Sequence, residues 1–315
     1  MTASPQFPRI ALIGLGLIGS SIARGVKALG LAGELVATDA SADVRQRADE
    51  IGLADRIAQT NAEAVRDADL VIACVPVGAC GQVAQDIADH LKSGAIVSDV
   101  GSVKNAVLRD MAAYLPPTID FIPAHPVAGT EHSGPDAGFA ELFVNRWCIL
   151  TPSPEAAPEA VERLKDFWTG LGANVEIMSA EHHDLVLAVT SHLPHLIAYT
   201  IVGTADELEG VTQSEVLKFS AGGFRDFTRI AASDPTMWRD VFLTNKEAVL
   251  EMLGAFQEDL SKLTRAIRRG DGDVLFDHFT RTRAIRRGIV NIGQDASGAD
   301  FGRPHPQLPP KPDKS

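Results

Sequence analysis

The chain has 315 residues, 45% hydrophobic and 22% charged, which is typical of a globular protein with about two domains. The formal net charge of −12 argues against nucleic acid and against an anionic membrane surface as partners. No apolar run is long enough to span a bilayer, and no signal peptide is evident. The three cysteines match no zinc-ligand spacing, so we expect reduced thiols and a cytoplasmic location.

The first element is a pattern that favours dinucleotide binding. A short buried strand is expected over Ile10–Gly14, and a helical pattern follows as far as Leu29. Between them the spacing is G-x-G-x-x-G, in which the glycines allow a tight turn, close approach of a pyrophosphate and helix–strand packing. The alternative is a glycine turn that serves packing alone. The expected cofactor-binding residues are Gly14, Gly16, Leu17, Ile18 and Gly19.

Asp39 strengthens the dinucleotide interpretation. It ends a second apolar run, twenty residues after Gly19. An acidic residue there accepts hydrogen bonds from ribose hydroxyls and repels a 2′-phosphate. The sequence therefore predicts NAD in preference to NADP.

The first part of the chain alternates apolar runs with helical patterns, which predicts a doubly wound parallel sheet to about residue 180. Strands are expected at Ile10–Gly14, Leu35–Thr38, Leu70–Val75, Ala95–Val100, Phe121–Ala124, Trp147–Leu150 and Val175–Met178. Helices are expected at Leu17–Leu29, Ala42–Ile51, Val83–Leu91, Val103–Ala113 and Glu155–Leu171.

Ligands of such sheets lie outside the carboxyl ends of the strands, so four loops should open on one edge. These loops are Gly14–Gly19, Cys74–Gly78, Asp99–Lys104 and Ala124–Gly134. Val75 and Pro76, in the second loop, join the expected cofactor-binding residues. Polar residues of the last two loops are candidates for chemistry.

Beyond residue 180 the pattern is helical throughout. One long helix is expected over Glu181–Leu208, and further helices over Gln213–Phe219, Met237–Leu263 and Asp273–Asn291. So long an apolar helix exposes more surface than one small domain covers, which predicts a homodimer. The expected divisions are a cofactor domain over residues 1–180, a helical substrate and dimerisation domain over 181–292, and a disordered tail over 293–315.

His125 is the candidate general base. It follows a predicted strand in a loop stiffened by Pro126 and glycines. A histidine with an ordinary pKa near ~6.5 suits proton abstraction from a hydroxyl. The alternative is a loop histidine that caps the backbone. Ser102 either caps the following helix or hydrogen-bonds His125 or the substrate.

The segment from Thr190 to Thr200 lies in the long helix, which Pro194 should kink. Ser191 and His195 are four residues apart and share a face, where they either meet the substrate or pack in the core. His192 and His195 resemble a metal pair, but no third ligand is evident, so no metal is expected.

Residues 222–240 form a dense polar segment. Arg225, Arg229 and Arg239 compete for the role of a carboxylate ligand, since arginine binds carboxylates bidentately. Asp226 is placed to hold Arg229. The alternative is a surface run of ion pairs.

Five motifs in this order resemble the prephenate dehydrogenase family, which includes arogenate and cyclohexadienyl dehydrogenases of tyrosine biosynthesis. The motifs are GLGLIGSS, DVGSVK, AHPVAGTEHSG, TSHLPH and GGFRDFTRIAASDPTMW, and the resemblance covers about residues 8 to 292. The resemblance implies a Rossmann domain followed by a helical dimerisation domain. It implies NAD(P)-dependent oxidative decarboxylation of prephenate to 4-hydroxyphenylpyruvate or of arogenate to tyrosine.

The resemblance also implies roles for individual residues. His125 would take the hydroxyl proton with Ser102 as its partner, and Arg229 would anchor the ring carboxylate. Thr130, Glu131 and Asp226 would form a polar network around that arginine, and Ser191 and His195 would face the substrate's side chain. Any inhibition by tyrosine would occur at the active site.

Two other functions stay open at this point. A β-hydroxyacid dehydrogenase would need a catalytic lysine, for which Lys218 and Lys246 are the candidates, although neither lies in a glycine-rich lysine motif. A non-catalytic nicotinamide sensor would not need His125, Ser102 and Arg229 together. The choice between prephenate and arogenate is not decided by the sequence.

Overall fold

The computed structural model describes residues 5–130, 132–153, 155–207 and 222–289. The chain divides into two compact units, residues 1–253 and 254–315. The expected helix at 213–219, the expected tail, Glu131 and Lys218 lie outside the described residues.

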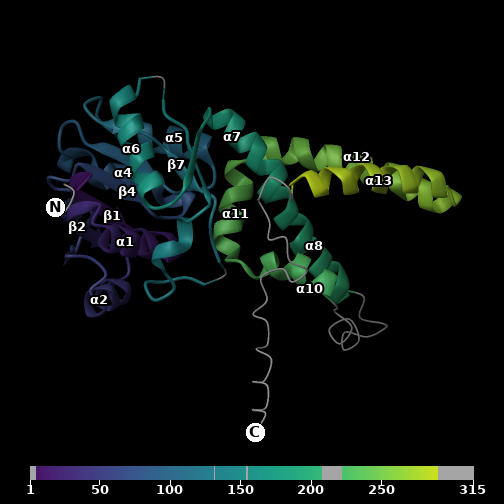
Figure 1. The fold of residues 1–315 in the computed structure, drawn as a ribbon, viewed down its shortest axis with the longest axis horizontal. Coiled ribbons are helices and arrows are strands. Elements are labelled where there is room, and N and C mark those ends of the chain that lie inside the picture. The colour runs from purple at the N-terminus through teal and green to yellow at the C-terminus, as the bar shows by residue number, and fades with distance from the viewer. Residues whose placement is uncertain (1–4, 131, 154, 208–221, 290–315) are drawn as a thin grey trace, which may run out of the picture. The chain divides into compact units, whose positions relative to one another are not determined.

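A six-stranded parallel sheet forms the base of the first unit, as the sequence predicted (Figure 1). Its order is β3-β2-β1-β4-β5-β6, so the chain reverses direction across the sheet between β1 and β4. The strands are β1 (Phe7–Ile13), β2 (Ala32–Thr38), β3 (Arg56–Ile57), β4 (Leu70–Ala73), β5 (Ile96–Asp99) and β6 (Asp120–Phe121). The helices between them are α1 (Leu17–Leu29), α2 (Ala42–Glu50), α3 (Asn61–Ala64), α4 (Cys80–Ile87) and α5 (Lys104–Ala112).

Helices cover both faces of this sheet, which explains why its strands read as unbroken apolar runs. Alternate residues of β1 enter two different buried clusters. Ile10 and Leu12 pack in one, and Ala11 and Ile13 in the other. The carboxyl ends of β1 and β4 therefore border the crevice where such sheets bind ligands.

The expectation of a single parallel sheet is wrong beyond β6. Three strands form a second, smaller sheet, in which β7 (Ala124–Pro126) runs antiparallel to β8 (Trp147–Leu150) and β8 runs parallel to β9 (Asn174–Ile177). The expected strand Phe121–Ala124 is divided between the two sheets around Pro123, which has no N–H for the ladder. α6 (Pro158–Gly170) packs against β9. His125 consequently lies within a strand and not in the loop after one.

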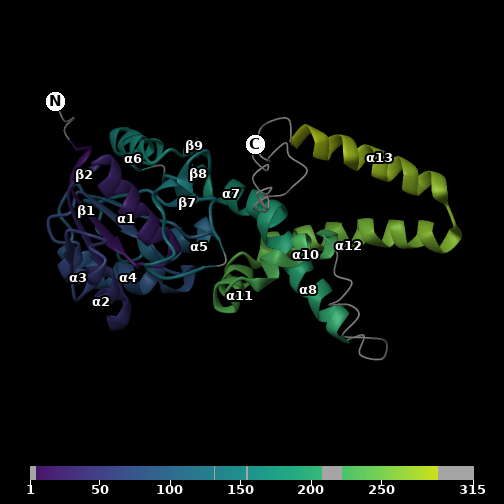
Figure 2. The ribbon, with the colours of Figure 1, turned by 60° about the horizontal axis from the view of Figure 1, so that its bottom comes forward.

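The expected long helix is present as one continuous helical stretch, Ala180–Glu207. It consists of α7 (Ala180–Leu187), a π-helical turn (Ala188–His192) and α8 (Leu193–Glu207), and Figure 2 shows α7 leading into α8. The wide turn ends just before Pro194, whose ring would clash with the carbonyl four residues earlier in a regular α-helix. The predicted kink therefore takes the form of a π turn.

By length and composition this stretch could cross a membrane, with a window of mean hydropathy 1.6. The expectation that no segment is long enough is wrong in that respect. Only 28% of that window is buried. The polar residues His183, Asp184 and His192 of its first part are buried and hydrogen-bonded inside the protein.

A short helical segment follows the undescribed residues 208–221. It comprises α10 (Gly222–Thr228), a 3₁₀ turn (Arg229–Ala232) and α11 (Pro235–Thr244). The expected single helix Met237–Leu263 is wrong, because α11 ends at Thr244, with Asn245 as its C-cap residue, before α12 (Lys246–Arg269) begins. Asn245 is buried and its side-chain amide donates to the backbone oxygen of Asp184, a long-range contact without a local signal.

Most of α12 belongs to the second unit, where it is followed by α13 (Gly272–Ile289) after Gly270, which has φ +67°. Both helices expose large apolar side chains. Leu260 and Ile267 on α12 are 51% and 67% exposed, and Phe276 and Phe279 on α13 are 70% and 56% exposed.

Candidate active site

Backbone geometry shapes the glycine-rich turn after β1. Gly14 has φ +97°, and a Cβ there would contact the backbone oxygen of Cys74. A Cβ on Gly19 would contact the oxygen of Gly14. The nearest atom to a Cβ on Gly16 is the Ser133 hydroxyl oxygen at 3.8 Å, so this face has room. The three glycines thus have the constraints that a pyrophosphate-binding turn requires.

Asp39 lies directly after β2 and is held over this turn. One carboxylate oxygen accepts the Leu15 N–H at 2.8 Å, and the other accepts the Ser41 N–H at 2.9 Å. The half-buried side chain is thereby fixed where a ribose would approach.

The other expected cofactor residues differ in exposure. Ile18 and Val75 are half-buried and Pro76 is exposed after β4, whereas the side chain of Leu17 belongs to the core. Leu17 can therefore meet a cofactor only through its backbone. These features together fit a dinucleotide.

His125 lies in β7 and is 8% exposed. Its Nδ1 is 2.8 Å from Nε2 of His183, and Nδ1 of His183 is 2.8 Å from a carboxylate oxygen of Asp184. His183 is completely buried. This Asp184–His183–His125 chain was not predicted, although both new members lie at the start of the long helix in a visible His-His-Asp run.

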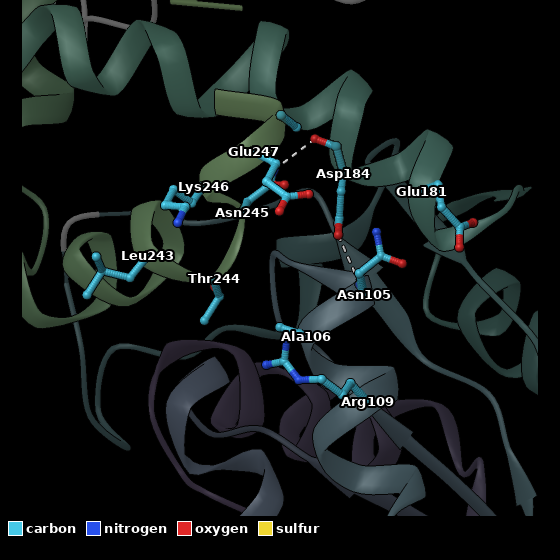
Figure 3. A pocket seen from close by; sticks show the side chains of 11 residues that line it. Asn105, Ala106, Arg109, Glu181, Asp184, Leu243, Thr244, Asn245, Lys246 and Glu247 are labelled. Carbon is cyan, nitrogen blue, oxygen red and sulfur yellow. Dashed lines mark hydrogen bonds between the residues drawn. The ribbon is translucent and has the colours of Figure 1, made fainter. Parts of the chain in front are cut away.

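Asp184 also caps α5. Its carboxylate accepts the backbone N–H groups of Lys104 at 2.7 Å and Asn105 at 2.9 Å, which are among the unsatisfied donors of that helix start. Figure 3 shows the Asp184 side chain reaching Asn105 at the border of a cleft of about 530 Å³. Asn245 and Glu247 border the same cleft.

Ser102 therefore does not have the capping role that the sequence allowed. Val103 occupies the N-cap position of α5, and Asp184 supplies the hydrogen bonds. Ser102 is half-buried and, within the described part of the chain, makes no hydrogen bond to His125. Its expected contact with a substrate stays a prediction.

A buried ion pair lies beside His125. Lys104 Nζ is 2.5 Å from a carboxylate oxygen of Asp99 and 2.6 Å from the oxygen of Ala124, and both charged side chains are fully buried. Asp99 also accepts the N–H groups of Gly101 and Ala124. The pair joins β5, α5 and β7 at the residue before His125. Both residues stand at the ends of DVGSVK but were not predicted as site residues.

Burial sets the protonation of the histidines. It lowers the pKa of His125 well below 6.5, and the nearby His183 and Lys104 lower it further. Burial likewise lowers the pKa of His183, and it lowers that of His192 to about 4. His125 is thus a neutral imidazole at pH 7, the form that accepts a proton.

Ser191 and His195 are both half-buried, and His195 Nδ1 donates to the backbone oxygen of Ser191 at 2.8 Å. Their expected contact with a substrate stays a prediction. The His195 ring stacks on Trp238, with centroids 3.7 Å apart. Nε2 of His195 is left as an acceptor.

Arg229 begins the 3₁₀ turn after α10 and is exposed. Burial lowers the pKa of His195, and the charge of Arg229 lowers it further, so the two side chains are close enough to interact. Arg225 Nε lies 3.8 Å from a carboxylate oxygen of Asp226. The hydroxyl of the exposed Thr130 accepts the backbone N–H of His132. The expected network of Thr130, Glu131 and Asp226 around Arg229 stays a prediction.

Two family models match nearly consecutive parts of the chain. Residues 22–177 match the nucleotide-binding domain of prephenate dehydrogenase, and residues 179–281 match its dimerization domain. A cyclohexadienyl dehydrogenase of Zymomonas mobilis is 47% identical over 280 residues, which cover 89% of this chain and 95% of the relative.

Two solved structures are similar throughout. Prephenate dehydrogenase from A. aeolicus, in complex with hydroxyphenyl propionate and NAD+, has a TM-score of 0.82 at 32% identity, covering 89% of this chain and 98% of the other. Synechocystis arogenate dehydrogenase has a TM-score of 0.75 at 27% identity, covering 89% and 99%.

Proposed function

The chain belongs to the prephenate dehydrogenase family, and from that premise we propose that it catalyses NAD-dependent oxidative decarboxylation of prephenate, of arogenate, or of both. The observation that carries the proposal is the neutral, buried His125, whose Nδ1 is engaged by His183. It follows Ala124, whose N–H donates to Asp99 at the carboxyl end of β5. A base at this position suits a reaction that removes a hydroxyl proton together with a hydride.

The chain's own residues account for the proton steps. His125 accepts the ring-hydroxyl proton at Nε2 while the hydride leaves the carbon that carries the hydroxyl. When bound, NAD supplies the hydride acceptor. Loss of carbon dioxide from the opposite ring carbon makes the ring aromatic, and His125 returns the proton to the phenolate oxygen. The reaction is thus balanced without net release of that proton.

Arg229 and His195 are the proposed ligands of the substrate's charged groups. Their electrostatic interaction brings a cation and a hydrogen-bonding ring together beside Trp238. An arginine binds a carboxylate bidentately. We assign Arg229 to the ring carboxylate, and Ser191 and His195 to the side chain, where prephenate has a keto group and arogenate an amino group.

Several finer assignments are also proposals. A functional division near residue 180 is supported by the two family models, which meet between residues 177 and 179. A homodimer is supported by the match to a dimerization domain and by the exposed apolar side chains of α12 and α13. A cytoplasmic location agrees with the three free cysteines.

Inhibition by tyrosine, if it occurs, is proposed to take place at the active site. The A. aeolicus relative binds hydroxyphenyl propionate, which differs from tyrosine only by the amino group.

The two alternatives from the sequence, a β-hydroxyacid dehydrogenase and a nicotinamide sensor, have no comparable support. Lys246 is the first residue of α12 and lines the cleft that Asp184 borders.

The test is formation of reduced nicotinamide by the purified protein. Prephenate and arogenate are supplied in turn with NAD or NADP, with and without tyrosine. We expect turnover with at least one substrate, faster with NAD, and inhibition by tyrosine that is competitive with the substrate. Absence of turnover with both substrates and both cofactors would refute the proposed function.

A further inference from the structure

We propose that His183 and Asp184 are positioning residues for the reaction: they hold His125 in the tautomer whose Nε2 has a free lone pair, and they stabilise the imidazolium formed there. The inference rests on the proposed function for its role in turnover. Its structural part, the tautomer of His125, stands on the hydrogen-bond geometry alone.

The direction of each hydrogen bond follows from Asp184. An ionised carboxylate only accepts, and this one already accepts two backbone N–H groups from the start of α5. Nδ1 of His183 must therefore carry a proton and donate it to Asp184 across 2.8 Å. In a neutral imidazole Nε2 is then the acceptor, so Nδ1 of His125 donates across 2.8 Å. The remaining nitrogen of His125, Nε2, has the lone pair.

Rigid elements fix each member of the Asp184–His183–His125 chain. His125 pairs with Ile149 across the antiparallel ladder of β7 and β8. Asp184 is 3% exposed and is tied both to α5 by its carboxylate and to Asn245 by its backbone oxygen. Little reorganisation is needed when a proton arrives, which is the condition for efficient electrostatic stabilisation.

Asp184 is also the negative charge best placed to stabilise the imidazolium. The groups that act on His125 are His183 from α7, Lys104 from α5, His192 and Cys148 from β8. Behind them, Asp184 is bonded to His183 and Asp99 is paired with Lys104. Asp99 is already neutralised by Lys104. Burial raises the pKa of Cys148 and lowers that of His192, so both are neutral at pH 7. The charge of Asp184 reaches His125 through His183.

Asp184→Asn is the most informative variant. Its amide would donate to Nδ1 of His183, which reverses both hydrogen bonds and leaves the proton of His125 on Nε2. We expect kcat to fall by about 10²–10⁴-fold, as for loss of a general base. Removing the anion also destabilises the imidazolium, so the acid limb of kcat/KM should move to lower pH.

A second variant separates positioning from folding. His183→Asn interrupts the hydrogen bonds between Asp184 and His125 but leaves the Asp184 carboxylate capping α5. We expect kcat to fall by about 10²-fold or more with NAD binding unchanged. The matched control is His182→Asn, an exposed neighbour on α7, which should behave as wild type. If kcat falls in both variants while the acid limb stays in place in Asp184→Asn, the residues act only structurally and the proposal is wrong. Wild-type kcat in either variant would equally refute it.

A direct measurement does not depend on turnover. Nitrogen NMR of protein labelled at histidine reports which ring nitrogen carries the proton. We expect Nδ1 of His125 to be protonated and Nε2 bare in the wild type, and the reverse in Asp184→Asn. A proton on Nε2 of wild-type His125 would overturn the inference even if the enzyme is active. The expected tautomer in a protein inactive toward both substrates would refute the proposed function instead.

Discussion

The two ends of the site are built on different principles. At the cofactor end, the turn from Gly14 to Gly19 works through backbone shape, and its parts are neighbours in the sequence. At the base end, His125 depends on His183, Asp184 and Lys104, which come from separate elements and are hydrogen-bonded in the interior. The cofactor end therefore suits a ligand common to many enzymes, whereas the base end is proposed to determine which ring nitrogen of His125 carries the proton.

This difference predicts different consequences of substitution. Changes at the cofactor end should alter affinity and preference for NAD and leave proton chemistry intact. Changes at the base end should reduce turnover or stability and leave NAD affinity intact. Each of the following variants tests this separation.

The largest effect is expected from His125→Asn. It removes the base but keeps a polar side chain in β7, and kcat should fall by ~10²–10⁴-fold. Affinity for NAD, measured by calorimetry, should not change. Near-normal turnover would remove His125 from the mechanism, and a parallel loss of NAD affinity would contradict the separation of the two ends.

Lys104→Met tests the stability of the base end. It leaves the fully buried Asp99 without its cation, so the free energy of unfolding should fall by about 3–5 kcal/mol in urea titrations. Lys92→Met is the control, because Lys92 is 48% exposed in its pair with Asp69, and it should cost no more than about 1 kcal/mol. Equal losses of unfolding free energy in the two variants would mean that the buried pair of Lys104 and Asp99 stabilises the protein no more than the exposed pair does.

Arg229→Ala addresses substrate recognition, separately from both ends. Loss of one side of a charged contact should lower kcat/KM for the substrate, by an amount that corresponds to about 2–4 kcal/mol of transition-state stabilisation. The control is Arg225→Ala, because Arg225 is an exposed arginine of the same segment and lies 3.8 Å from Asp226. Its loss should change kcat/KM little. If the two variants lose the same amount, Arg229 is not the specific carboxylate ligand.

Asp39→Asn should give the smallest effect, confined to the cofactor end. Loss of a charged acceptor for ribose should weaken NAD binding by about 1.5–3 kcal/mol and raise the preference for NADP. Kinetics with both cofactors measure the ratio, with Asp43→Asn on α2 as the control. An unchanged ratio would show that Asp39 does not contact the ribose.

The sequence predicted what local patterns encode. The glycine turn, the position of Asp39 after β2 and the parallel sheet all follow from spacing within a few residues. The π turn before Pro194 also has a local cause. These features needed no knowledge of distant parts of the chain.

The interior contacts of the base end were beyond sequence reasoning. The cap of α5 comes from Asp184, eighty residues away, and it displaces the local candidate Ser102. Asn245 is the C-cap residue of α11, and its side chain donates to Asp184 near the start of the long helix, a contact sixty-one residues away in the sequence. The ion pair of Asp99 and Lys104 was missed because two charges near a loop usually signal solvent, and only the fold buries them.

The most direct test of the account is the pH dependence of kcat/KM in the wild type and in His125→Asn. Burial, His183 and Lys104 lower the pKa of His125, so the base stays neutral, and active, as pH falls below 6.5. We predict a plateau that extends from neutral pH to well below 6.5, with an acid limb that is absent from the residual activity of His125→Asn. An acid limb at or above pH 6.5 that persists in the variant would contradict the account.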